Sequence, residues 1–206
     1  MQLFATPDLL VIALLRFGHI AFGIIWIGHL AFLNLVNVPF QSDLDAELKA
    51  KVNPKLLLRA FWFFRWGAMY TFLFGWLLFG HKYFHLKIFF ESEGGISNRG
   101  IWILAAGLLG TVMWFNVWFL IWPRQKLILG GLAAGKPHPE AAKLAAFAAK
   151  VSRFNLFASG PMLLGMIVPN NDPGRSPWFM LIATVLGIGF WFGMIKRSRK
   201  IKTNAA

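Results

Sequence analysis

The chain has 206 residues, of which 57% are hydrophobic and 14% charged, and its formal net charge at pH 7 is +13. Because soluble domains carry about 25% charged residues, this composition excludes an ordinary soluble protein and predicts an integral membrane protein. The basic residues lie between and after the apolar stretches, which favours a role in membrane topology over nucleic-acid binding. These residues include no cysteine, which excludes disulfides, thiolate ligands and a c-type haem attachment site among them.

Apolar stretches long enough to cross a bilayer recur along the chain, and each crossing needs about 20 residues. We predict an all-α, polytopic transmembrane helix bundle with about five spans in a single domain, 1–206. The approximate spans are 9–38, 54–80, 100–122, 139–168 and 176–195. The first is too long for a signal peptide and lacks a basic start, so we expect it to be retained. The fourth begins with an alanine-rich, basic half that we expect to protrude from the bilayer.

Local signals predict a helix boundary and an orientation. Asn53 is the expected N-cap of the second helix, with Pro54 in its first turn. Most Lys and Arg residues of the loops and tail fall on one predicted side of the membrane. The positive-inside rule therefore places the N-terminus outside and the basic C-terminus in the cytoplasm. We expect an integral protein of the bacterial inner (plasma) membrane.

Ionisable and amide side chains interrupt the apolar run of the first span. Such groups are costly in a membrane and mark functional sites by default. At about 100° per residue, several of them share one helix stripe. The stripe contains Arg16, His19, Gly23, Asn34 and Asn37. His29 lies about 80° around the helix from His19 and about 15 Å further along, so the two cannot ligate one metal ion.

The histidines are the candidate ligands of a metal or haem. A haem b between helices needs an inward imidazole, space, a second axial ligand and cations for its propionates. His19 is the candidate imidazole, Gly23 the source of space and Arg16 the propionate partner. His81 and His85, spaced i, i+4, share a helix face and are candidates for the second ligand or for a separate metal ion. The alternatives are interhelical hydrogen bonding or a solvated cavity for His19, and a simple interfacial position for the pair.

A polar cluster of amides and guanidinium groups is expected in the cytoplasmic half of the bundle. Its members are Asn34, Asn37, Arg65, Asn116, Arg153 and Asn155. The cluster suits an anionic or quinone-like ligand, but we favour packing between helices, because amides often bond across membrane helices. No carboxylate pair or nucleophile is placed for acid–base work, so the sequence identifies no catalytic residue.

Five segments carry unusual Arg, Asn and Trp residues within or beside the spans. They are HIAFGIIWIG (19–28), FLNLVNVP (32–39), LRAFWFFRWG (58–67), LGTVMWFNVWFLIWPRQK (109–126) and SRFN (152–155). Together they resemble the membrane domain of PuuD-type urate hydroxylases, also called the urate oxidase N-terminal family. The resemblance extends over about 16–168. It implies a multi-helix membrane oxidoreductase that passes electrons from a substrate such as urate to a c-type cytochrome.

The sequence departs from this family pattern in two places. Many members of that family carry a C-terminal cytochrome c domain. No such domain follows the last span here, so a haem c is expected on a partner. After the fourth span the chain reads VPNNDP (168–173), where the family pattern leads us to expect a His near a Tyr-Pro pair. That change puts both a second haem ligand and urate chemistry in doubt.

Two hypotheses follow from these observations. One is a urate-hydroxylase-like membrane redox protein, a candidate oxidoreductase, that binds haem b and exchanges electrons with a separate c-type cytochrome. The other is a non-catalytic accessory subunit of a larger membrane complex. A transporter is less favoured because the spans contain no acidic residue for proton or cation coupling.

Overall fold

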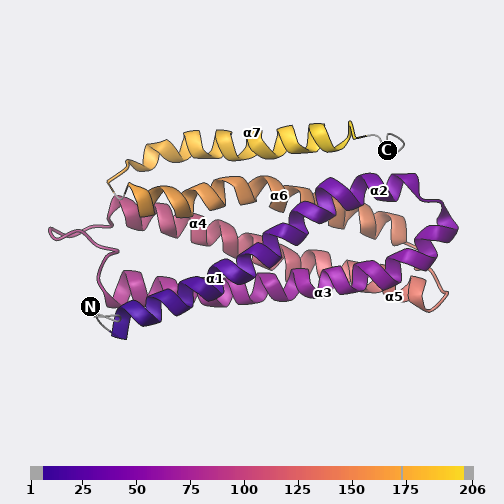
Figure 1. Ribbon diagram of the computed structural model, residues 1–206, viewed down its shortest axis with the longest axis horizontal. Helices are drawn as coiled ribbons and strands as arrows, with labels where there is room; N and C mark the ends of the chain where they lie inside the picture. Colours follow the sequence, from indigo (N-terminus) through magenta and orange to yellow (C-terminus); the bar gives the residue numbers. More distant parts are fainter. Residues whose placement is uncertain (1–6, 173, 202–206) are drawn as a thin grey trace, which may run out of the picture.

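The computed structural model describes residues 7–172 and 174–201 as a bundle of long helical segments (Figure 1). Within these residues the regular structure is helical, apart from an isolated β-bridge between Phe90 and Ile96. The expected all-α, membrane-type bundle is therefore confirmed. In chain order the elements are α1 (Pro7–Ala31), η1 (Phe32–Asn37), α2 (Val38–Asp43), α3 (Ala46–Phe79), η2 (Gly80–His85), α4 (Asn98–Phe115), η3 (Asn116–Ile121), α5 (Trp122–Ala133), α6 (Ala141–Asn171), η4 (Pro177–Phe179) and α7 (Met180–Ser198).

Several of these elements join into continuous segments that run the length of the bundle (Figure 1). The start of α1, the 86–97 loop and the turn between α6 and α7 lie together at one end, which we call the N-terminal end (Figure 1). The π-helical elements η1, η2 and η3 interrupt or extend the α-helices without a turn between them. Such π-helical stretches are frequent at functional sites.

Helix α3 begins earlier than the sequence predicts. Its N-cap is Asp45, whose carboxylate accepts a hydrogen bond from the backbone amide of Leu48 at 2.8 Å. The expected cap, Asn53, lies inside the helix and exchanges side-chain hydrogen bonds of 2.8 and 2.9 Å with Gln41. Asn53 therefore joins α3 to α2, and Pro54 occupies the helix interior instead of its first turn.

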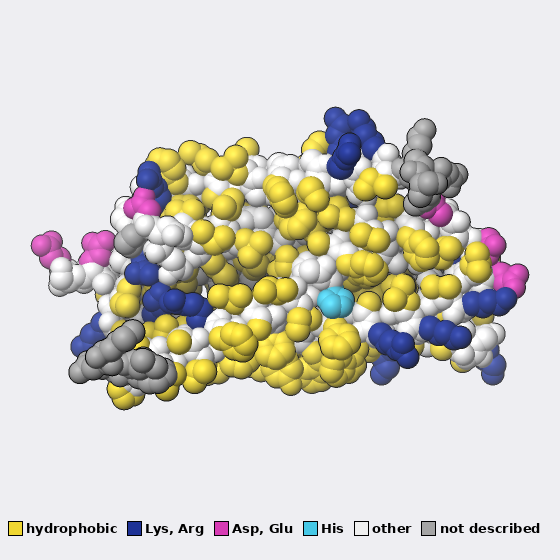
Figure 2. Space-filling model, in the orientation of Figure 1, with side chains coloured by type: hydrophobic (Ala, Val, Ile, Leu, Met, Phe, Trp, Pro, Cys, Tyr) yellow, Lys and Arg dark blue, Asp and Glu magenta, His cyan; other side chains and the backbone are white. Residues whose placement is uncertain are grey.

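Four of the long segments are long and apolar enough to cross a membrane. They are 7–43, 98–133, 141–171 and 177–198. The remaining segment, 46–85, is equally long but carries Arg65 together with several Trp and Tyr residues that lower its hydropathy. Hydrophobic side chains cover the middle of the face shown in Figure 2, and Lys and Arg side chains gather toward its two ends. This distribution is that of an integral membrane protein.

The core lies where the segments meet, and it contains fully buried Leu30, Phe64, Met113 and Leu156. Helix α1 packs along α3, while α6 packs against both α4 and α7. The backbones of α6 and α7 come close because of two glycines. A Cβ atom added to Gly160 would lie 2.5 Å from the carbonyl carbon of Gly187. Small residues of this kind permit close helix crossing in membranes.

Candidate functional site

His19 projects from α1 onto α3, where its ring is held by a backbone group. Its Nδ1 lies 2.9 Å from the carbonyl oxygen of Thr71. Because a carbonyl only accepts hydrogen bonds, Nδ1 carries the proton of the neutral ring. Within the described residues Nε2 makes no hydrogen bond, so it keeps a free lone pair. This is the state in which a histidine binds a metal through Nε2.

The space for the His19 ring comes from Gly75 on α3. A Cβ atom on Gly75 would lie 2.8 Å from Cε1 and 2.9 Å from Nδ1 of His19. Gly23, which the sequence suggested as the source of space, faces the methyl group of Thr71, and a Cβ there would make an ordinary contact of 3.8 Å. Sequence reasoning missed Gly75 and Thr71 because the register between α1 and α3 leaves no local pattern in the sequence.

His29 does not approach His19. Its Nδ1 donates a hydrogen bond to the carbonyl oxygen of Ile25 in its own helix at 2.7 Å. Its ring stacks against Phe63, with centroids 6.0 Å apart. The sequence geometry placed His29 on a different face from His19, and these contacts agree with that placement.

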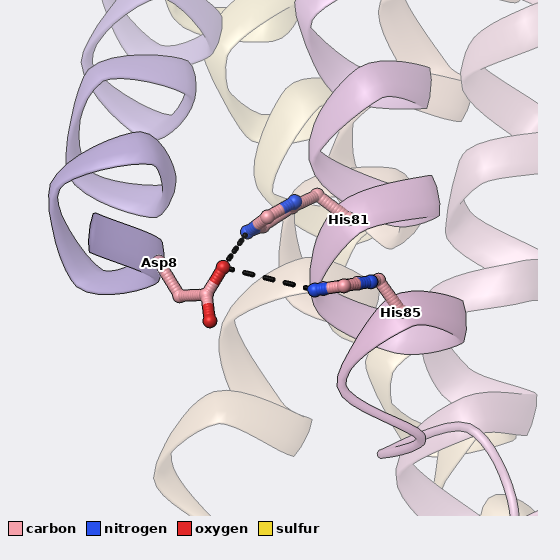
Figure 3. Close-up of side chains that lie close together, drawn as sticks. All are labelled: Asp8, His81 and His85. Atoms are coloured by element: carbon pink, nitrogen blue, oxygen red, sulfur yellow. Dashed lines mark ion pairs between the residues drawn. The ribbon is translucent and has the colours of Figure 1, made fainter. Parts of the chain in front are cut away.

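A second group of candidate ligands lies at the N-terminal end (Figure 3). Asp8 extends from the first turn of α1 toward His81 and His85 on η2. Its Oδ1 lies 3.2 Å from Nε2 of His81 and 3.7 Å from Nε2 of His85. One ligand atom from each residue lies within 4.8 Å of the others. Donors at this spacing suit one ion bound at about 2.0 to 2.2 Å from each.

The predicted metal ligands thus fall in two places. Asp8 and His19 both lie on α1, about 16 Å apart along the helix at 1.5 Å per residue. His19 contacts α3 at Thr71 and Gly75, whereas the histidine pair turns toward Asp8. The i, i+4 spacing of His81 and His85 predicted that they share a helix face. Asp8 could not be predicted as their partner, because it lies far from them in the sequence.

Basic side chains gather around Tyr83 beside this group. The Nζ of Lys82 and the Nη2 of Arg99 both donate hydrogen bonds to Oδ1 of Asn170, at 3.1 and 2.9 Å. Burial, with the positive charges of Arg99 and Arg16, lowers the pKa of Lys82 to about 8. Burial raises the pKa of the Tyr83 hydroxyl, although Arg99 and Arg16 act in the opposite direction. Arg16, the expected propionate partner, is exposed on α1.

The amides of the expected polar cluster form separate interhelical contacts. The Nδ2 of Asn34 donates a hydrogen bond of 2.9 Å to Oγ of Ser152, which joins η1 to α6. The Nδ2 of Asn116 donates to Oδ1 of Asn155 at 2.8 Å, and Asn155 donates to the carbonyl of Met113 at 3.0 Å. These contacts satisfy buried amides across helices.

The other members of that cluster have different neighbours. The guanidinium carbon of Arg65 lies 4.1 Å from the ring centroid of Trp122, which is a cation–π contact. Asn37 accepts a hydrogen bond of 3.2 Å from Gln41. Arg153 is half-buried on α6. The six residues are therefore divided among several contacts.

Comparison with known proteins gives one match. A family model described as urate oxidase N-terminal matches residues 85–200, which is more than half of the chain. The match begins at His85, so it includes the third, fourth and fifth helical segments but not α1. No curated protein and no solved structure matches the chain.

Proposed function

Since the chain belongs to the urate oxidase N-terminal family, we propose that it is a urate-hydroxylase-like membrane redox protein that binds haem b and exchanges electrons with a separate c-type cytochrome. The observation that supports the haem site is the orientation of His19. Its Nδ1 proton is engaged by the carbonyl of Thr71, and its Nε2 lone pair is free. A bound haem would supply one-electron chemistry.

The residues around His19 would supply a haem with one ligand to its iron and one partner for a propionate. His19 would ligate the iron through Nε2, and Arg16, about one turn away on α1, would neutralise a propionate. His29 bonds within its own helix, and the pair at the end of α3 turns toward Asp8. These contacts direct His29, His81 and His85 away from His19, so none of the three would hold the haem together with it.

Asp8, His81 and His85 form the second position that we propose for a metal ion. Two imidazoles and one carboxylate are a donor set that binds Zn²⁺ or Fe²⁺. Metal analysis of the purified protein tests this position. We expect bound metal in the wild type and its loss in Asp8→Ala and in His81→Ala. Equal metal content in all three proteins contradicts it.

Haem content of the purified protein, measured by the pyridine haemochrome assay, tests the haem proposal. We expect haem b in the wild type and its loss in His19→Ala. His29→Ala is the matched control, because it removes an imidazole from the same helix, and it should keep the haem. Loss of haem in both variants, or in neither, contradicts ligation by His19.

A non-catalytic accessory subunit is the second candidate function. The contacts between Asn116 and Asn155 and between Asn34 and Ser152 favour it, because they join helices and use the amides for packing alone. A colourless protein that co-purifies with other membrane subunits would support this candidate. Reduction of a purified c-type cytochrome by the haem-loaded protein would exclude it.

A further inference from the structure

We propose that the N-terminal end of the bundle binds an oxyanion, held by Lys82, Arg99 and the hydroxyl of Tyr83. The ligand class is an anion with several oxygen acceptors, such as the phosphate of a lipid headgroup or a free phosphate. This site is separate from His19, and the inference does not depend on haem binding.

The first argument is uncompensated positive charge. Lys82 and Arg99 share one neutral acceptor, Oδ1 of Asn170. The Nζ of Lys82 lies 5.6 Å from the ring centroid of Tyr83, and the guanidinium carbon of Arg99 lies 6.0 Å from it. Two cations on one amide oxygen repel each other, and the amide neutralises neither. An anion between them would remove this repulsion.

The second argument is a set of donors without acceptors. Tyr83 is only 3% exposed and Lys82 only 9%. The Tyr83 hydroxyl and Nε of Arg99 are buried and make no hydrogen bond of good geometry among the described residues, although the guanidinium of Arg99 lies close enough to the hydroxyl to act on its pKa. An ammonium group has three donors, and Lys82 makes a single hydrogen bond with the described part of the chain. Buried donors without acceptors are destabilising, and an oxyanion offers enough oxygen atoms to satisfy them.

Two carboxylates at this end, Asp8 and Asp172, have other partners. Asp8 faces the histidine pair, and Asp172 accepts a hydrogen bond of 2.7 Å from Nε of Arg175. Within residues 7–172 and 174–201, the ion pairs include none with Arg16, Lys82 or Arg99. The positive charge of the cluster is therefore left for a ligand.

The position of the cluster admits two sources of the anion. Lys82 and Tyr83 follow the predicted second span, 54–80, so they lie where the bilayer meets water. A lipid phosphate resides at this depth, and a free phosphate can reach it from the solvent. The two sources differ experimentally in whether lipid is needed.

Thermal unfolding of the full chain in a non-ionic detergent tests the site. We compare sodium phosphate with sodium chloride at equal ionic strength, and separately add phosphatidylglycerol. A ligand at about 100 times its Kd should raise the Tm by roughly 5 °C or more for a protein of this size. A rise with phosphate indicates a free anion, and a rise with phosphatidylglycerol alone indicates a headgroup. No rise with either overturns the proposal.

Tyr83→Phe is the informative variant because it removes the unpaired hydroxyl and keeps the ring packing. We expect unchanged Tm in chloride and roughly tenfold weaker binding of the effective anion, since one hydrogen bond to a charged group is lost. Lys87→Gln is the matched control, an exposed lysine at the same end, and it should bind as the wild type does. Equal affinity in wild type and Tyr83→Phe overturns the assignment of the hydroxyl.

Lys82→Met gives an independent readout of charge. Without anion, removal of a buried cation that shares its acceptor with Arg99 should raise the Tm, and the response to anion should disappear. A lower Tm in chloride together with an unchanged anion response would show that Lys82 serves the fold alone, and it would overturn the proposal.

Discussion

Replacing Gly75 by alanine would place a methyl group in the space that the His19 ring occupies. The new Cβ would lie 2.8 Å from Cε1 and 2.9 Å from Nδ1. Because carbon atoms in contact are separated by about 3.5 to 4.0 Å, the ring must move by roughly 0.7 Å or more. That movement weakens the 2.9 Å hydrogen bond from Nδ1 to Thr71.

Overpacking of this kind costs about 1 to 3 kcal/mol, and the weakened hydrogen bond adds up to about 1 kcal/mol. Alanine recovers up to about 1 kcal/mol through its higher helix propensity. We therefore expect a net loss of roughly 1 to 3 kcal/mol. This loss corresponds to a fall in Tm of about 2 to 12 °C for a chain of 150 to 250 residues.

Thermal unfolding of the single and double variants checks this value. Gly80→Ala is the matched control in the same helical segment, because a Cβ there meets nothing within 4 Å among the described residues. In the His19→Ala background, Gly75→Ala should cost nothing, since the ring it displaces is gone. If Gly75→Ala is as neutral as Gly80→Ala, or if its cost persists without the His19 ring, the placement of that ring is wrong.

Three further substitutions test the contacts that hold the bundle. Gly160→Ala should lower the Tm by several degrees, because the added methyl group forces α6 and α7 apart. Gly189→Ala is the control, since a Cβ atom there meets nothing within 4 Å among the described residues, and it should leave the Tm unchanged. Equal Tm values for the two variants would refute the close crossing. Asn155→Ala removes two interhelical hydrogen bonds and should destabilise the protein by about 1 to 2 kcal/mol in chemical unfolding. Arg65→Lys keeps the charge but loses the planar contact with Trp122, so a fall in Tm is expected, and an unchanged Tm would mean that the cation–π contact contributes nothing.

Four of the long helical segments could be predicted because each carries a continuous apolar signal. The start of α3 could not. Asn53 and Pro54 form a good local start signal, yet α3 begins at Ala46. Asp45 caps the helix instead of Asn53. The side chain of Asn53 is buried, and its amide donates a hydrogen bond to Gln41 on the neighbouring helix α2.

The candidate site could be predicted only where its residues share one helix. The spacing of His81 and His85 revealed their common face, and the helix stripe identified His19. Thr71, Gly75 and Asp8 could not be found in this way, because each meets its histidine across two helices whose relative register depends on the packing of the whole bundle. The same applies to Lys82 and Arg99, since they meet at Asn170 only in the folded chain.

The residues of the expected polar cluster show the opposite outcome. Their common depth suggested one cluster, but depth alone does not determine which helix faces which. Asn116 and Asn155 meet because η3 packs on α6. Arg65 instead lies over Trp122, so an aromatic ring supplies the partner expected for that cation.

The central claim is that Nε2 of His19 ligates haem b, and a cavity variant tests it most directly. The reduced-minus-oxidised absorption spectrum of His19→Gly should lack the b-type signal of the wild type, and added imidazole should restore that signal by occupying the vacated space. A structural role for His19 would not produce this rescue. A wild-type protein without a b-type signal after haem reconstitution, or a signal that His19→Gly retains without imidazole, would contradict the claim.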